Sequence, residues 1–215
     1  MKSSILVVGL GRFGAAAARE LERLGNEVLA IDRGEAIVNE IAPDVTHAVQ
    51  LDASDEQALR SVGAGEFDYA IVAISSAIDA SIFATMALKN LGVGHVIAKA
   101  ATELHGAILE RVGADRVVYP EREMGTRVAH SIAIPHVIDY LDVAPRFGIV
   151  KVRPPAAFVG RTLKDLDLPG RLQISPIAVR RGSDVTFNPH RDVVVEAGDE
   201  LIMMGSDASL EKMDG

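Results

Sequence analysis

Two patterns of apolar and polar positions alternate along the first 120 residues. Short apolar runs of the kind that form buried parallel strands occur at residues 5–8, 27–31, 47–50, 69–73, 96–98 and 116–118. Between them, apolar residues recur every three or four positions, which predicts helices at residues 14–24, 35–41, 55–62, 78–91 and 103–112. Strands that alternate with helices in this way predict an α/β fold, a Rossmann-like doubly wound parallel sheet.

The regular alternation of strand-like and helix-like segments ends after Pro120. Residues 123–130 have the spacing of a helix, and residues 136–141 predict one or two further helical turns. A short helix is predicted at residues 162–166. Strand-like runs return beyond residue 146 with turn signals between them, at residues 147–152, 177–180, 193–196 and 201–204.

These patterns divide the chain into three parts. We expect a doubly wound domain at residues 1–122, a helical connector at residues 123–143 and a smaller C-terminal α+β domain at residues 144–215. A chain of 215 residues is long enough for one ordinary domain and one small domain. A unit of about 70 residues is only marginally stable alone, which favours dimerisation.

Composition agrees with an aliphatic core and excludes several classes of protein. Aromatic residues make up 4% of the chain against 48% for hydrophobic residues, as in sheets built from Val, Ile, Leu and Ala. The net charge of −8 argues against nucleic-acid binding. The lack of cysteine excludes disulfides and sulfur-ligated metals, and it is consistent with the cytosol. We expect no membrane-inserted segment, because Asp79 interrupts the most apolar stretch, residues 69–88.

A glycine-rich turn, G-x-G-x-x-G, follows the first predicted strand and opens the first predicted helix. Gly9 permits a tight turn, Gly11 lets the backbone approach phosphates at the helix N-terminus, and Gly14 allows close packing of the helix on the strand. Arg12 and Phe13 lie within the turn. Arg12 either points along the phosphates or covers apolar surface. The turn predicts a nucleotide or dinucleotide site.

An acid at the end of the second predicted strand strengthens this prediction. Asp32 stands eighteen positions beyond Gly14, where a carboxylate accepts the hydroxyls of an adenosine ribose and repels a 2′-phosphate. NADP is therefore disfavoured. The neighbouring Arg33 either attracts such a phosphate or lies flat on the adenine ring.

Further candidate residues follow from topology, because ligands bind outside the carboxyl ends of parallel strands. Lys99 follows the fifth strand and either reaches a terminal phosphate or is an ordinary solvated lysine. The candidates at the ends of the third, fourth and fifth strands are Asp52, Ala53, Ile74, Ser75, Ser76, Lys99 and Ala100.

Four segments carry a family resemblance: GLGRFG at residues 9–14, VLAID at 28–32, GADRVVYPEREMG at 113–125 and GDELIMMG at 198–205. Together they resemble the cytosolic regulatory subunits of Ktr/Trk-type potassium uptake systems. The resemblance covers essentially the whole chain, as an N-terminal RCK domain (regulating potassium conductance) followed by a C-terminal RCK domain. One copy of each domain, with the Arg-Phe pair in the turn, resembles the Ktr branch and not the tandem Trk form.

The resemblance implies an assembly and a partner. It implies dimers that assemble into a homo-octameric ring, with the connector as the dimer hinge. The ring docks on a membrane-embedded potassium-translocating subunit, so that the protein is cytoplasmic and peripheral to the inner face of the cell membrane. ATP accompanies the active state and ADP the inactive one in the Ktr branch, and the Trk branch is also linked to NAD(H).

The resemblance also assigns roles to single residues. Glu121 is placed near the phosphates at the dimer interface, where Mg²⁺ or Ca²⁺ would bridge its carboxylate to phosphate oxygens. Taken alone, Glu121 is also a plausible helix-start carboxylate, and His105 an ordinary surface histidine. The remaining assignments are Arg12 to the γ-phosphate, Asp32 to the ribose, Asp52 and Ala53 to the adenine, and Lys99 and His105 to the phosphate side.

One departure concerns cyclic di-AMP, which some relatives bind at the interface of their C-terminal domains. The arginine of that site aligns with Pro169 in this chain, and Arg171 lies only nearby. Asn188 and Pro189 match the pattern loosely. The departure argues against cyclic di-AMP binding.

The glycine turn alone allows two other functions, an NAD(H)-binding Trk-type regulator and a small NAD-dependent oxidoreductase. A dehydrogenase needs a proton relay facing the nicotinamide. The sequence has no Ser-x-Tyr-x-x-x-Lys arrangement, and its six histidines lack the spacing of metal ligands. We therefore expect a ligand-gated regulator and not an enzyme.

Overall fold

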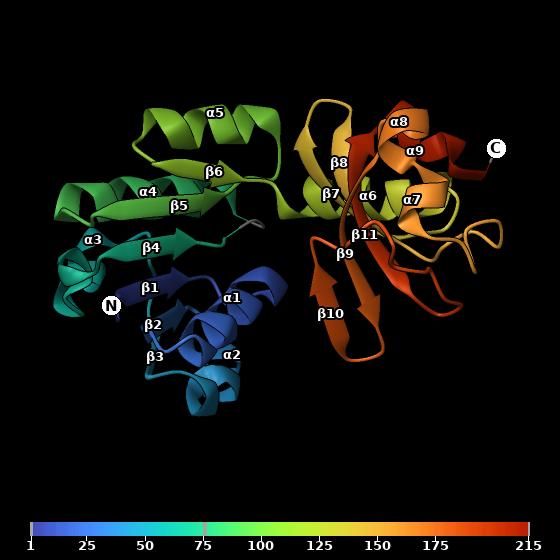
Figure 1. Ribbon diagram of the computed structural model, residues 1–215. Helices are drawn as coiled ribbons and strands as arrows, with labels where there is room; N and C mark the ends of the chain where they lie inside the picture. The colour runs from blue at the N-terminus through green and yellow to red at the C-terminus, as the bar shows by residue number, and fades with distance from the viewer. Residues whose placement is uncertain (1, 75–76, 215) are drawn as a thin grey trace. The chain divides into compact units, whose positions relative to one another are not determined.

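The computed structural model describes residues 2–74 and 77–214, and its internal contacts divide the chain into two units, Met1–Glu121 and Arg122–Gly215. The first unit is a six-stranded parallel sheet in the order β3-β2-β1-β4-β5-β6 (Figure 1). This order is that of a doubly wound sheet and confirms the predicted fold. Its strands are β1 (Ser4–Val8), β2 (Glu27–Asp32), β3 (His47–Gln50), β4 (Tyr69–Val72), β5 (His95–Lys99) and β6 (Arg116–Val118).

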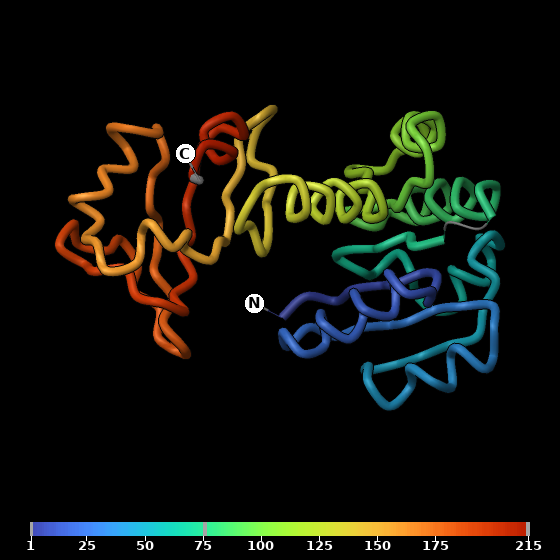
Figure 2. The backbone as a smooth tube through the Cα atoms, turned by 90° about the vertical axis from the view of Figure 1, so that its right-hand side faces the viewer, coloured from blue at the N-terminus to red at the C-terminus, as the bar shows by residue number. Residues whose placement is uncertain are grey.

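Helices cover both faces of this sheet, because successive side chains of a strand point to opposite faces. Leu6 and Val8 of β1 enter a core closed by α3 (Glu56–Ser61), α4 (Ile78–Leu91) and α5 (Glu103–Arg111). Ile5 and Val7 enter a second core on the other face, closed by α1 (Arg12–Arg23) and α2 (Glu35–Ile41). Figure 2 shows α4 and α5 in green on one side of the strands and α1 and α2 in blue on the other.

The helix starts differ in a way that matters for ligand binding. Asp55 caps α3 by accepting the N–H of Gln57, and Thr102 caps α5 by accepting the N–H of His105. Helix α1 starts at Gly11, and no described side chain caps it. The N–H groups of its first turn therefore remain available to a ligand.

The second unit is an antiparallel sheet in the order β10-β9-β11-β8-β7. Its largest fully buried side chains include Leu168, Ile174, Leu201 and Met203, which form a core of their own. The elements of the unit are α6 (Pro120–Ala133), which begins in the first unit, β7 (Val137–Ala144), β8 (Phe147–Val152), α7 (Leu163–Leu166), α8 (Leu168–Leu172), β9 (Ser175–Arg181), β10 (Asp184–Phe187), β11 (Glu200–Ser206) and α9 (Asp207–Leu210).

The helical turns expected at residues 136–141 are wrong, because this segment is strand β7. The pairing of β7 with β8 shifts register between Val137 and Asp139. An irregularity of this kind changes which face the following residues present, so Val137 and Tyr140 are both buried although they are three positions apart. A spacing of three is also typical of a helix, which explains the error.

Two further corrections concern the second sheet. Residues 193–196 do not form a strand of it: the backbone of Val193 and Val195 instead hydrogen-bonds to residues 160–163. Strand β10 was not expected, because all four of its residues are exposed and carry no alternation of buried and exposed positions. Within the described ranges, no helix has the length and apolarity needed to cross a bilayer.

Candidate functional site

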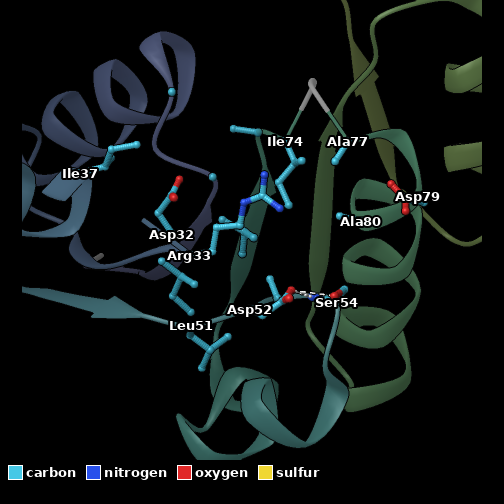
Figure 3. A pocket seen from close by; sticks show the side chains of 16 residues that line it. Asp32, Arg33, Ile37, Leu51, Asp52, Ser54, Ile74, Ala77, Asp79 and Ala80 are labelled. Carbon is cyan, nitrogen blue, oxygen red and sulfur yellow. Dashed lines mark hydrogen bonds between the residues drawn. The ribbon is translucent and has the colours of Figure 1, made fainter. Parts of the chain in front are cut away.

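A cavity of about 480 Å³ lies beyond the carboxyl ends of β1, β2, β3 and β4 (Figure 3). Its volume falls in the usual range for small-molecule sites. Among the predicted ligand residues it brings together Gly9, Gly11, Asp32, Arg33, Asp52, Ala53 and Ile74. Ser75 and Ser76 lie outside the described residues.

The three glycines of the turn have separate structural roles. Gly9 has a φ of +89°, which favours glycine. A Cβ on Gly14 would lie 1.9 Å from the Gly9 carbonyl oxygen, so only a residue without a side chain lets α1 pack this close to the turn. A Cβ on Gly11 would meet no described atom within 4 Å. Gly11 therefore faces open space at the start of α1, where a phosphate can approach the backbone.

Asp32 is held in place by the backbone around the turn. Its Oδ2 accepts the N–H of Leu10 at 2.7 Å, and its Oδ1 accepts the N–H of Gly34 at 2.9 Å. Each carboxylate oxygen can accept a further hydrogen bond. The side chain is thus oriented to accept the two hydroxyls of a ribose at the edge of the cavity.

The far end of the cavity carries a second ordered acid. Asp52 Oδ1 accepts the N–H of Ser54 at 2.9 Å and its hydroxyl at 2.6 Å. These bonds lower the pKa of Asp52, with a smaller contribution from the positive charge of Arg33. In Figure 3 the side chain of Arg33 extends into the middle of the cavity, where it can stack on a flat base.

Sequence reasoning missed several residues of the cavity. Asp79 and Ser54 contribute polar groups, and Ile37 and Leu51 contribute apolar walls. Asp79 is the second residue of α4, the helix that follows β4 in the chain, and this position was the available signal. Among the described charged residues of the cavity lining, the acids Asp32, Asp52 and Asp79 outnumber the cation Arg33. The part of the cavity away from the glycine turn therefore suits a neutral adenosine with hydroxyl and amino donors better than a phosphate.

Two cationic residues, Arg12 and Lys99, lie beside the glycine turn and are not part of the described cavity lining. Arg12 is exposed at the first residue of α1. The Lys99 ammonium lies 2.5 Å from Oε1 of Glu121 and 5.7 Å from the centroid of the Phe13 ring. Lys99, and more weakly Arg12, lower the pKa of Glu121. A phosphate chain that leaves the cavity along the turn would meet these two cations.

Two predicted ligand residues lie away from the surface. Ala100 is 2% exposed, and its N–H donates to the carbonyl of Val118. His105 is 1% exposed, and its Nδ1 accepts the N–H of Ala101 at 3.3 Å. Burial lowers the pKa of His105. Both residues therefore shape the loop after β5, and a direct contact of either with ligand stays a prediction.

The donor set for a metal ion is small. No group of three or more His, Cys, Asp or Glu residues suited to a metal occurs in the described part of the chain. Glu121 offers one carboxylate whose side chain is 71% exposed. That set fits a hard cation such as Mg²⁺ only if phosphate oxygens and water complete the coordination, as is common for Mg²⁺ on nucleotides.

Comparison with known proteins agrees with this geometry. The TrkA-N domain model matches residues 5–120, and the TrkA-C domain model matches residues 148–214. The Ktr system potassium uptake protein C of Bacillus subtilis (strain 168) is 39% identical over 214 residues, which cover 100% of this chain and 97% of that protein. The chain belongs to the Ktr/Trk family of potassium uptake proteins. The resemblance inferred from its motifs is confirmed.

Other members of this family, and more distant structures, extend the likeness. The Ktr system potassium uptake protein A of the same organism is 34% identical and covers 97% of this chain and 94% of that protein. The structure of the GsuK channel superposes with a TM-score of 0.70 at 19% identity, over 100% of this chain and 40% of that one. At this identity the likeness shows the fold alone. The Ktr/Trk chain spans less than half of that longer channel chain.

Proposed function

We propose that the protein is the regulatory subunit of a potassium transporter and that an adenine nucleotide bound at its TrkA-N unit sets the transporter's state. The observation that carries this proposal is the division of charge at the glycine turn. An acidic cavity suits adenosine, and Arg12 and Lys99 lie outside it, where the phosphates would emerge. Membership of the family supplies the connection to potassium uptake.

ATP and ADP would differ in the contacts that their terminal phosphates make with Arg12 and Lys99. Both place adenosine against Asp32, and the extra phosphate of ATP reaches furthest toward Arg12. A divalent cation held between that phosphate and Glu121 would offset the repulsion between two anions. The two nucleotides can shift the protein only by the difference in their affinities for its two states.

Membership of the family supports a proposed assembly. Dimers joined into an octameric ring would dock on a membrane-embedded potassium-translocating subunit, which places the protein at the cytoplasmic face of the membrane. In a ring that changes shape as a unit, the free-energy differences of the sites add. Eight sites that each favour one shape by about 1 kcal/mol would therefore populate that shape almost completely.

A second candidate is NAD(H) sensing. One solved structure of similar fold is a GsuK channel bound to NAD, with a TM-score of 0.67 at 19% identity. The ribose-binding position of Asp32 serves NAD as well as ATP. We favour ATP and ADP because Arg12 and Lys99 suit a terminal phosphate, whereas a nicotinamide nucleotide ends in a ring. A role as an oxidoreductase would need a proton relay that we do not find among the candidate residues.

Calorimetry on the purified protein tests the proposal. ATP, ADP, NAD⁺ and NADH are titrated with and without Mg²⁺, and light scattering measures the mass of the assembly. We expect ATP and ADP to bind, and Arg12→Ala to reduce the preference for ATP over ADP. Arg111→Ala is the control, since Arg111 is an exposed cation in the last turn of α5. Binding of NADH alone, or an unaltered ATP preference in Arg12→Ala, would contradict the proposal.

A further inference from the structure

The contact between Lys99 and Glu121 joins two side chains with very different surroundings. Lys99 is 5% exposed, whereas the Glu121 side chain is 71% exposed. A buried ammonium is costly unless an anion lies beside it, because the interior solvates the charge poorly. Glu121 supplies such an anion, at 2.5 Å from the Lys99 ammonium.

The two partners also differ in how easily they can move. Lys99 is the last residue of β5, and its stem is packed within the first unit beside Phe13. Glu121 is the second residue of α6 and lies at the surface, so its side chain can turn into water at little cost. The cation is therefore fixed, and the anion is the group that can leave.

A phosphate that approaches Lys99 needs the place that the Glu121 carboxylate occupies. Two anions at one ammonium repel each other unless a cation lies between them. Arg12, which also attracts Glu121, is the other cation of the same site. Nucleotide binding and the Lys99–Glu121 contact thus compete for the same positive charges.

We propose that Glu121 is an internal competitor of the nucleotide phosphates for Lys99, so that a phosphate which binds Lys99 displaces the Glu121 carboxylate from it. This competition rests on the nucleotide binding proposed above. It adds the residue pair, Lys99 and Glu121, through which phosphate binding would act on α6. Helix α6 continues from Glu121 into the second unit. The displaced residue is therefore part of the element that leads out of the nucleotide-binding unit.

The metal-ligand role proposed above for Glu121 requires a divalent cation, and with that cation present it makes the opposite prediction. A carboxylate that binds a bridging cation helps ATP to bind, so its removal weakens binding. A carboxylate that competes for Lys99 opposes ATP, so its removal strengthens binding. The two roles separate in EDTA, because without divalent cations a metal ligand has no effect.

The test is isothermal calorimetry in EDTA at low salt on the full chain. Glu121→Gln keeps the shape of the side chain and removes its charge, and Glu110→Gln makes the same change at an exposed site near the end of α5. We expect Glu121→Gln to bind ATP about threefold to tenfold more tightly than the wild type, in line with partly exposed ion pairs. Adenosine, which has no phosphate, should bind all three proteins equally.

A double-mutant cycle ties the effect to Lys99. Lys99→Met keeps the buried stem and removes the ammonium, so it should weaken ATP binding and abolish the gain from Glu121→Gln. Unchanged or weaker ATP binding by Glu121→Gln, or an equal gain in the Lys99→Met background, overturns the competition. If the wild type binds neither ATP nor adenosine, the proposed function fails and this inference fails with it.

Discussion

Asp32 shows how a single side chain can be prepared for its ligand. Both of its oxygens already accept backbone N–H groups, from Leu10 and Gly34, so little side-chain freedom remains to be lost on binding. The same bonds join the end of β2 to the glycine turn. Asp32 is therefore expected to matter for the shape of the turn as well as for the ligand.

The first prediction follows from this double role. Asp32→Asn replaces one acceptor oxygen by an NH₂ group that faces a backbone N–H. We expect ATP affinity to fall about tenfold or more and the free energy of unfolding to fall by about 1 kcal/mol. Calorimetry and urea unfolding measure the two effects, with Asp184→Asn on the exposed strand β10 as the control. Unchanged affinity would show that the ribose does not use Asp32.

The second prediction concerns His105 and pH. Burial lowers its pKa in the folded protein, so below the ordinary value of 6.5 the unfolded chain binds the proton more readily. Stability should therefore be unaffected by His105 above that pH and should fall as the pH decreases below it. Between about pH 7.5 and pH 5.5 this one group contributes a loss of at most about 1.4 kcal/mol.

The variant His105→Asn checks this assignment. The asparagine oxygen can accept the Ala101 N–H in place of Nδ1, while the titrating ring is gone. Urea unfolding at the two pH values should show a smaller acid loss in the variant than in the wild type. An equal loss would mean that other groups account for the pH dependence.

For single residues, the sequence predicts which side chains are candidates for ligand binding better than it predicts which side chains are buried. The glycines and Asp32 could be predicted as site candidates because backbone geometry and ribose chemistry favour those residue types at those spacings, and the structure places Gly9, Gly11 and Asp32 at the cavity. His105 is different: it occupies the first turn of α5, and only tertiary packing decides whether such a position faces a ligand or the interior. No sequence pattern around His105 predicts that its side chain is buried.

At the scale of elements, the glycine turn combines two demands that separate variants can test. Gly14 lies where α1 packs on the turn, and Gly11 lies where α1 faces open space. Gly14 is therefore required by the packing of α1, whereas Gly11 is proposed to let a ligand approach. The G-x-G-x-x-G pattern does not by itself distinguish these roles.

The third prediction compares alanine at these two positions. Gly14→Ala brings a Cβ to 1.9 Å from the Gly9 carbonyl oxygen, so we expect a loss of stability of about 3 kcal/mol. Gly11→Ala meets no described atom and keeps an ordinary φ of −64°, so it should fold as well as the wild type but bind ATP more weakly. Thermal unfolding and calorimetry give the two readouts. Equal effects in both variants would contradict the division of roles.

The two sheets differ in how far their elements could be predicted. In the first sheet, strands buried on both faces and helices with one apolar side give separate signals, and all six strands were placed within a residue or so. In the second sheet the irregular pairing of β7 gave its buried residues a helical spacing. Strand β10, exposed throughout, gave no signal. Sheets covered on one side and interrupted by irregularities are harder to recognise from a pattern of apolar residues.

For the whole molecule, each unit has cores of its own. Among the described residues, the first unit has one core on each face of its sheet and the second unit has a core of its own. Units with separate cores can unfold separately, and a ligand stabilises only the unit that binds it.

The fourth prediction is that heating produces two transitions and that ATP raises the temperature of one of them. At a concentration of ATP about 100 times its dissociation constant, the binding unit gains about 2.7 kcal/mol. Scanning calorimetry with and without ATP measures the shift. At the same ATP concentration Asp32→Asn should reduce the gain to about 1.4 kcal/mol or less, because its affinity is expected to be about tenfold lower or weaker still. A single transition that moves as a whole would show that the two units unfold together.

The boundary between the units falls after the second residue of α6 and not in a loop. Each residue of an α-helix is rotated by about 100° around the helix axis from the one before it. A change in helix length therefore rotates all later residues, which a change in the length of a flexible linker does not do. One residue inserted after Glu121 would turn everything beyond it by about 100° around the helix axis, whereas seven would restore the orientation to within about 20°. A change in the length of α6 after Glu121 therefore changes the helical phase of every later position of the helix, whereas a side-chain substitution leaves that phase unchanged.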